Sequence, residues 1–157
     1  MKLTDFMVTS ATVADVQATD KKGVVKELID SLVAADTLGD QTGPAAVRAV
    51  MKRESLGSTG IGRGVAIPHA RMDGVDEVIG VLGRSAAGVD FASLDGDPVQ
   101  IFFLILSPPD KPDPHLKALE HISTVLRDDN FCRFMKQAET PGALNELLVE
   151  ADETFFS

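Results

Sequence analysis

The sequence predicts an α/β fold in which a single mixed β-sheet is flanked by helices on both faces. The run from Val99 to Leu106 is apolar at every position except Gln100, as is typical of a central strand covered on both sides. Segments with a helical spacing of apolar residues precede and follow the strand-like segments, so helices are available for both faces of the sheet.

The first part of the chain is predicted to contain a short strand and two helices. Residues 12–18 have strand character. Asp20 can cap a helix whose apolar residues follow a helical period, and Gly39 is the expected end of that helix. A second helix is expected to begin near Pro44, which is acceptable in a first turn, and to continue toward Leu56.

The second part of the chain is predicted to contain three strands and three helices. Residues 65–68 and 75–83 are the expected strands before the apolar strand, the first because a residue before proline prefers extended geometry. A loop from Ser107 to Pro114 then holds four of the eight prolines. The helices expected to end the chain cover residues 114–127, 129–138 and 141–151.

Length and composition predict one domain that spans residues 1–157. The net charge of −9 argues against nucleic acid and against an anionic membrane as partners, because both require a basic surface. The N-terminus lacks the apolar core of a signal peptide, and the longest apolar run is too short to cross a bilayer. We therefore expect a cytoplasmic protein without membrane insertion. The single cysteine, Cys132, excludes an internal disulfide and is expected to fill space in the core.

The most distinctive segment is a glycine-rich run that leads through a short apolar stretch to His69. It places four glycines within the eight residues from Gly57 to Gly64. Their spacing matches neither the dinucleotide fingerprint nor the phosphate loop of nucleotide-binding proteins. The run is either a tight turn or a loop whose backbone amides approach an anion, and the residues alone leave both interpretations open. The candidate anion-binding residues in it are Gly57, Ser58, Thr59, Gly60 and Gly62.

The three histidines are His69, His115 and His121. His115 lies on the stripe of the helix that is expected to be buried, whereas His121 is predicted to face solvent. The residues predicted to form that stripe are Leu116, Leu119, Ile122 and Leu126.

The predicted start of this helix gives His115 a special setting. Asp113 is the expected N-cap, and Pro114 is the expected first helical residue. An imidazole at the positive end of the helix dipole has a lowered pKa and favours its neutral form. The same helix end attracts anions, above all phosphate.

Two other chemistries lack partners at the right spacing. Two histidines are too few for zinc, and no cysteine or carboxylate stands at ligand spacing, so no metal or other cofactor is expected. Ser55 and Ser58 lie near His69 without a nucleophile-elbow pattern, which disfavours a serine hydrolase. The pair Arg53-Glu54 is either a solvated pair or a guanidinium placed at a phosphate, where planar bidentate donors bind best.

The block from Arg53 to His69 resembles the IIA domain of the phosphoenolpyruvate-dependent phosphotransferase system. The resemblance is to the fructose/mannitol class, and most of all to its stand-alone nitrogen-regulatory branch. It rests on Arg53-Glu54, on Gly57-Ser58-Thr59-Gly60-Ile61-Gly62 with Gly64, and on Ile67-Pro68-His69. It continues through Val89-Asp90-Phe91, Asp95-Gly96, Pro98-Val99, Pro108, His115-Leu116 and the stretch from Leu144 to Leu148, and so covers nearly the whole chain.

The resemblance implies a phosphorylatable histidine at His69, a second active-site histidine at His115 and an arginine beside the site at Arg53. It implies a phosphocarrier rather than a turnover enzyme, with an HPr-like protein as donor. A regulatory role, in which target proteins distinguish the two phosphorylation states, is the favoured interpretation. The alternatives are an uptake component that passes phosphate to a separate IIB domain, and an interaction module that no longer accepts phosphate.

The expected mechanism assigns a task to each group. A neutral ring nitrogen of His69 attacks phosphorus, while its other nitrogen donates to a carbonyl or a side chain and so fixes which nitrogen attacks. His115 and the N-terminal amides of its helix stabilise the developing charge, together with Arg53 and the glycine-run amides. Ala70 stands where the family usually has glycine, and it would be strained if that position required a positive φ.

Overall fold

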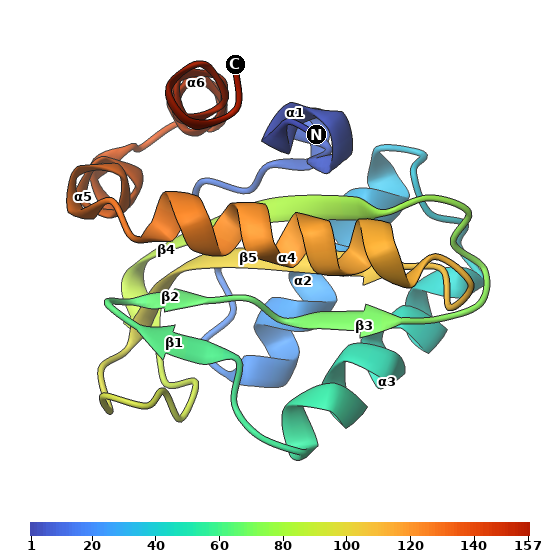
Figure 1. Cartoon of the computed structure of the whole chain (residues 1–157). Helices are drawn as coiled ribbons and strands as arrows, with labels where there is room; N and C mark the ends of the chain where they lie inside the picture. The colour runs from blue at the N-terminus through green and yellow to red at the C-terminus, as the bar shows by residue number, and fades with distance from the viewer.

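The computed structural model describes all 157 residues and has the predicted architecture, a mixed five-stranded sheet with helices on both faces (Figure 1). The helices are α1 (Leu3–Phe6), α2 (Lys21–Ala34), α3 (Thr42–Ser55), α4 (Pro112–Leu126), α5 (Asp129–Gln137) and α6 (Pro141–Phe155), with a 3-10 turn at Thr9–Ala11. The strands are β1 (Gly60–Gly62), β2 (Val65–Ala66), β3 (His69–Arg71), β4 (Ile79–Val89) and β5 (Val99–Ser107). None of the helices combines the length and apolarity that a membrane span requires.

Strand β5 is the centre of the sheet, as its apolar sequence predicts. It pairs antiparallel with β4 on one side and parallel with both β2 and β3 on the other. β2 lies beside Ile101 and Phe102, and β3 lies beside residues 105–107, so these two short strands follow one another along the same edge of β5. Every residue of β5 except Gln100 is buried.

The side chains of β5 alternate between two apolar cores, one on each face of the sheet. Ile101, Phe103 and Ile105 pack in the core that α1, α4, α5 and α6 cover. Phe102, Leu104 and Leu106 pack in the core under α2 and α3. Ser107 continues the first series, and its hydroxyl meets His115 of α4. The alternation therefore decides on which face the polar end of β5 lies.

The first helices agree with the sequence in type but not in every boundary. Asp20 caps α2 by accepting a hydrogen bond from the Gly23 amide at 2.8 Å, which confirms the prediction. The helix ends at Ala34 and not at Gly39, because Asp36 adopts a φ of 60° and the chain turns back to bury Leu38. Residues 12–18 form no strand, and only Val13 makes an isolated bridge to Gly83 at the edge of β4.

The strands before β5 also differ from their predicted boundaries. The strand expected at residues 65–68 is β2, which stops at Ala66. Pro68 has no N–H to continue a ladder, and the chain rejoins the sheet only as β3 at His69. The strand expected at residues 75–83 is β4, which begins later, at Ile79, and continues to Val89. The hairpin strand β1 was not predicted.

Helix α4 begins earlier than predicted and is rotated relative to its expected buried stripe. Lys111 is the N-cap and Pro112 the first helical residue, so the assignment of Asp113 as N-cap was wrong. The buried residues are His115, Ala118, Ile122, Val125 and Leu126. Leu116, one residue and about 100° around the helix from His115, is 62% exposed, against the prediction.

The prediction that His121 faces solvent was also wrong. Helix α6 runs past its expected end at residue 151 to Phe155, and the ring of Phe156 then stacks on His121 with centroids 4.2 Å apart. His121 is therefore half-buried. Cys132 fills core space as predicted, and burial raises the pKa of its thiol.

Both chain ends lie on the same side of the molecule, where α1 packs beside α6 (Figure 1). Asp152 of α6 is 3% exposed and accepts hydrogen bonds from the Leu3 amide at 2.6 Å, the Thr4 amide at 3.1 Å and the Thr4 hydroxyl at 2.8 Å. This carboxylate holds the start of α1 against α6.

Replacing Asp152 with alanine is expected to destabilise the fold. Hydrogen bonds to a charged group contribute about 1.5–3 kcal/mol, so we expect Asp152→Ala to lower the free energy of unfolding by about 2 kcal/mol in urea. The exposed neighbour Glu153 provides the control, because Glu153→Ala is expected to change stability by less than about 0.5 kcal/mol. Equal stabilities of the two variants would show that the carboxylate does not hold α1.

Candidate functional site

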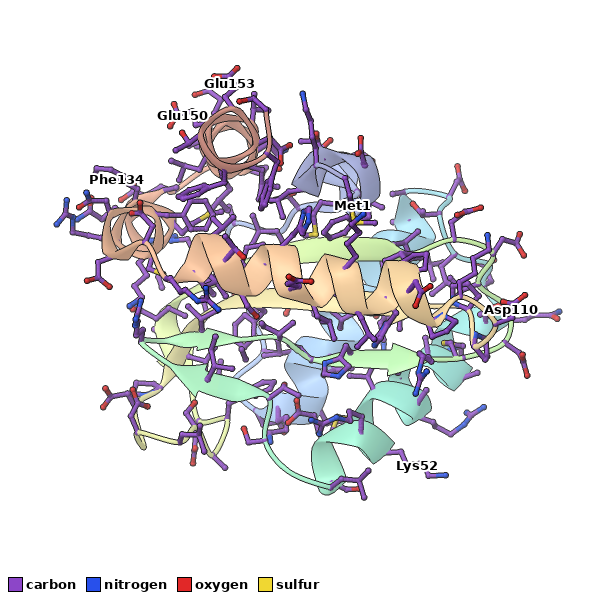
Figure 2. All side chains as sticks on the ribbon, viewed as in Figure 1. Met1, Lys52, Asp110, Phe134, Glu150 and Glu153 are labelled. Carbon is purple, nitrogen blue, oxygen red and sulfur yellow. The ribbon has the colours of Figure 1, made fainter.

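A pocket of about 330 Å³ lies at the edge of the sheet, next to β3. Its walls come from α3, from β3 and from the start of α4. The lining residues are Ala49, Lys52, Arg53, Leu56, His69, Ala70, Arg71 and His115. The pocket therefore brings together His69, His115 and Arg53, which are far apart in the sequence. Figure 2 shows Lys52 extending outward from α3.

The register of the sheet places His69 on the face that α4 covers, where it meets His115. His69 pairs with Ile105 and Arg71 pairs with Ser107 on parallel strands, so the side chains of His69 and Arg71 both lie on that face. His115 is the fourth residue of α4 and belongs to the buried stripe of that helix. The two imidazole rings approach to 5.6 Å between centroids, at an angle of 54°.

The hydrogen bond that His69 makes determines which of its ring nitrogens keeps a lone pair. Nδ1 lies 2.7 Å from the carbonyl oxygen of Ile67. A carbonyl only accepts, so the neutral ring carries its hydrogen on Nδ1 and keeps the lone pair on Nε2. The sequence predicted a partner of this kind for one ring nitrogen, and the structure identifies which nitrogen it is.

Burial lowers the pKa of both imidazoles. For His69 burial is the largest effect; the Ile67 carbonyl opposes it, and the positive charge of Arg53 adds to it. For His115, burial and then the charges of His69 and Arg71 lower the pKa to about 4. The lowered pKa of His115 agrees with the prediction, but its main cause is burial and not the helix dipole. Both rings are therefore neutral near neutral pH.

Helix α4 contributes fewer amides to the pocket than predicted. Pro112 and Pro114 have no N–H, and the His115 amide donates to the Lys111 carbonyl. Among the first four residues of the helix, only Asp113 retains an amide that could face an anion. Charge stabilisation in this pocket therefore falls mainly on side chains.

Three basic side chains line the pocket in a chain whose net charge is −9. Arg53 is held in place by a hydrogen bond of 2.9 Å from Nη1 to the Gly57 carbonyl. Arg71 and Lys52 were not predicted as site residues. Arg71 could have been found from the period of two along a strand, since it follows His69 by two residues. No comparable signal in the sequence marks Lys52.

The glycine-rich run connects α3 to the hairpin and does not line the pocket. The Thr59 amide donates to the Glu54 carboxylate at 3.3 Å, and the Gly60 amide donates to Ser58 Oγ at 3.0 Å. The Gly57 amide donates to the Glu54 carbonyl. Because these amides have partners in the run itself or at Glu54, the structure does not present them to an anion. The predicted loop residues outside the pocket are Gly57, Ser58, Thr59, Gly60 and Gly62.

The neighbouring residues Arg53 and Glu54 have opposite surroundings. Glu54 is 5% exposed and forms an ion pair of 2.9 Å with Lys21 of α2, in addition to accepting from the Thr59 amide and hydroxyl. Glu54 thus fixes the end of α3 to α2 and to the glycine-rich run. Arg53 is then directed to the pocket, so the two residues do not form a solvated pair.

Ala70 is not strained. It lies in β3 paired with Leu106, and the non-glycine residues with a positive φ are Asp36, Arg63 and Ala92. An alanine therefore fits the position after His69. No group of three or more histidine, cysteine, aspartate or glutamate side chains lies close enough together to hold a metal ion.

The arrangement suits the transfer of an anionic group. A neutral imidazole with a defined lone pair can act as nucleophile, and a second imidazole stands beside it. The guanidinium groups of Arg53 and Arg71 and the ammonium of Lys52 supply positive charge at the same pocket.

Comparison with known proteins gives matches over nearly the whole chain. The family model described as "Phosphoenolpyruvate-dependent sugar phosphotransferase system, EIIA 2" matches residues 6–151. A nitrogen regulatory protein of Bradyrhizobium diazoefficiens is 33% identical over 148 residues, which cover 94% of this chain and 95% of the relative. The fructose-specific EIIABC component of Bacillus subtilis is 33% identical over 153 residues, and this chain spans 24% of its length.

Solved structures show the same fold. The nitrogen regulatory protein IIA-Ntr of Neisseria meningitidis superimposes with a TM-score of 0.82 at 28% identity, covering 92% of this chain and 97% of that structure. The IIA mannitol structure of Escherichia coli superimposes with a TM-score of 0.70 at 18% identity, covering 88% and 96%, which shows similarity of fold alone.

Both pocket histidines are expected to stay neutral at a pH where an ordinary histidine is half protonated. In a pH titration followed by long-range nitrogen–proton NMR, we expect His115 to titrate near 4 and His69 below 6.5. Protonation is disfavoured because it would create a buried charge beside Arg71. His69→Gln assigns the signals, and it should raise the midpoint of His115 by removing one neighbouring charge. A His115 midpoint at or above 6.5 would contradict this description of the pocket.

Proposed function

Because the chain belongs to the EIIA 2 family of the phosphoenolpyruvate-dependent sugar phosphotransferase system, we propose that His69 accepts a phosphoryl group from an HPr-like protein. The observation that carries this proposal is the hydrogen bond between His69 Nδ1 and the Ile67 carbonyl, which leaves Nε2 as the nucleophile in a basic pocket. The protein acts as a phosphocarrier, since phosphohistidine can pass its phosphoryl group on or back. The exchange takes place in the cytoplasm.

The transfer is a single in-line displacement. The lone pair on His69 Nε2 forms the new N–P bond while the P–N bond of the donor phosphohistidine breaks, and the donor imidazole leaves with that electron pair. The His69 ring gains positive charge during attack. The Ile67 carbonyl stabilises this charge because it already accepts the Nδ1–H bond at 2.7 Å.

The phosphoryl oxygens are stabilised by the side chains around His69. Charge builds on three equatorial oxygens in the transition state, and fixed donors aimed at these oxygens lower the barrier. His115 donates a ring N–H, and Arg53 and Arg71 supply guanidinium donors. Lys52, which lines the same pocket, adds a positive charge.

A regulatory role is supported by the relative that matches this chain over 95% of its own length, which is named a nitrogen regulatory protein. Phosphorylation adds nearly two negative charges to a pocket lined by three basic residues, which is enough to change which target surface docks there. The same pocket thus serves as acceptor and as switch.

The second candidate is a sugar-uptake component that passes phosphate to a separate IIB domain. It is favoured by the 33% identity to a fructose-specific EIIABC component. Incubating the phosphorylated protein with a fructose-type IIB domain separates the two roles. Rapid onward transfer would support uptake, whereas a stable phosphohistidine supports regulation.

His69 is expected to be the only residue that takes up phosphate. With phosphoenolpyruvate, enzyme I and HPr, wild type should gain one acid-labile phosphate per chain, and His69→Ala should gain none because the nucleophile is removed. His121→Gln is the matched control, since His121 stacks on Phe156 outside the pocket, and it should be labelled like wild type. Equal labelling of His69→Ala and wild type would exclude the proposed acceptor.

His115 and Arg53 are expected to affect the rate of transfer but not the acceptor itself. Removing one fixed donor to a developing charge typically slows a reaction by about 10²–10³-fold, so His115→Ala and Arg53→Ala should each slow the phosphorylation of His69 by about 10²-fold. Quench-flow measurement of labelled protein gives the rates. Arg48→Ala, on α3 outside this pocket, should keep the wild-type rate. Unchanged rates in His115→Ala or Arg53→Ala would remove that residue from the mechanism.

A further inference from the structure

Ser107, the last residue of β5, has a buried hydroxyl directly beneath the site. Its side chain belongs to a residue with 0% exposure, and its Oγ lies 2.6 Å from Nδ1 of His115. The hydroxyl makes no other hydrogen bond in the structure. Ser107 does not line the pocket, so any effect it has on the reaction passes through His115.

The burial of Ser107 determines which group donates in this hydrogen bond. A serine hydroxyl has one hydrogen to donate, and a buried hydroxyl hydrogen without an acceptor is unfavourable. If His115 donated from Nδ1, the hydroxyl hydrogen of Ser107 would have no acceptor within reach. The hydroxyl therefore donates to Nδ1, and the neutral ring of His115 carries its hydrogen on Nε2.

We propose that Ser107 is a positioning residue that fixes His115 in the Nε2–H tautomer, so that this ring presents an N–H donor to the phosphoryl group at His69. The inference rests on the proposed phosphocarrier function. The carbonyl of Ile67 fixes the opposite tautomer in His69, with the hydrogen on Nδ1. The two neighbouring rings therefore have complementary roles: His69 offers a lone pair as nucleophile, and His115 offers an N–H as hydrogen-bond donor.

The register of the sheet and the buried stripe of α4 bring Ser107 and His115 together. Ser107 lies on the α4 face because β5 alternates, and it is paired with Arg71, two residues after His69. His115 reaches the hydroxyl because it belongs to the buried stripe of α4. A ring held only by packing could flip and exchange its two nitrogens. The Ser107 hydrogen bond selects one orientation and one tautomer.

The first test measures the tautomer of His115 in the unphosphorylated protein by long-range nitrogen–proton NMR near neutral pH. We expect Nε2–H in wild type, a mixture of tautomers in Ser107→Ala, and Nε2–H again in Ser107→Thr, which keeps the hydroxyl. Ser85→Ala is the matched control, because Ser85 is a second buried serine of the sheet (3% exposed) whose hydroxyl accepts from the Gly88 amide away from the site. A wild-type His115 with its hydrogen on Nδ1 overturns the proposal, as does an unchanged tautomer in Ser107→Ala.

The second test measures phosphorylation of His69 in the same variants. Loss of a group that orients a metal-ligating histidine commonly costs about 10–100-fold, and by the same mechanism Ser107→Ala should lower the maximal rate of His69 phosphorylation about 10-fold. The concentration of phosphorylated HPr that gives half of this rate should not change. Ser107→Thr should restore the maximal rate to within about twofold of wild type, and Ser85→Ala should match wild type. A wild-type maximal rate in Ser107→Ala, or a rate in Ser107→Thr as low as in Ser107→Ala, contradicts a positioning role.

The two tests separate this inference from the phosphocarrier proposal. If wild type accepts no phosphate, the phosphocarrier proposal fails, while the tautomer measurement on the free protein still decides what Ser107 does to His115. If Ser107→Ala does not fold, the wild-type tautomer alone still confirms or overturns the assignment of the donor.

Discussion

The chemistry that the pocket can support depends on one hydrogen bond, from Nδ1 of His69 to the carbonyl of Ile67. It links two residues on either side of Pro68, where the edge of the sheet is interrupted between β2 and β3. Proline offers no N–H to the ladder, and the interruption leaves the Ile67 carbonyl to the imidazole ring. The backbone itself thus determines which nitrogen of His69 carries the hydrogen. A side-chain partner could rotate away or titrate, whereas this carbonyl can do neither.

The rest of the fold surrounds that bond with the groups that the chemistry requires. β5 fixes the register of β3, so His69 and Arg71 lie on the face covered by α4. Helix α4 then brings His115 to within 5.6 Å of the His69 ring, between centroids. Helix α3 brings Arg53 from the other side, and the buried Glu54 fixes the end of α3 through Lys21 and Thr59. The positive charges of the basic side chains lower the pKa of the two imidazoles, and the same charges attract a dianionic phosphoryl group to the pocket.

Apolar patterning predicted the central strand, the helices and the two-faced sheet, because burial on both faces leaves a continuous apolar run. The sequence also predicted that His69, His115 and Arg53 belong to one site, and they do line one pocket. It could not show that the Thr59 amide has a partner, since this depends on the buried Glu54 carboxylate. The exposure of Leu116 depends on which side of α4 faces the sheet, and the stacking of His121 on Phe156 depends on where the chain end after α6 lies. Ser107 carries no signal in the sequence, where a serine before two prolines has the pattern of a loop.

Under the proposed phosphocarrier function, the backbone determines which nitrogen of His69 carries the phosphoryl group. The most direct measurement is phosphorus and nitrogen NMR of the phosphorylated protein, with alkaline hydrolysis to identify the phosphohistidine isomer. The hydrogen bond to Ile67 predicts phosphate on Nε2, with the hydrogen retained on Nδ1. Phosphate on Nδ1 would require that bond to break, and it would contradict the account.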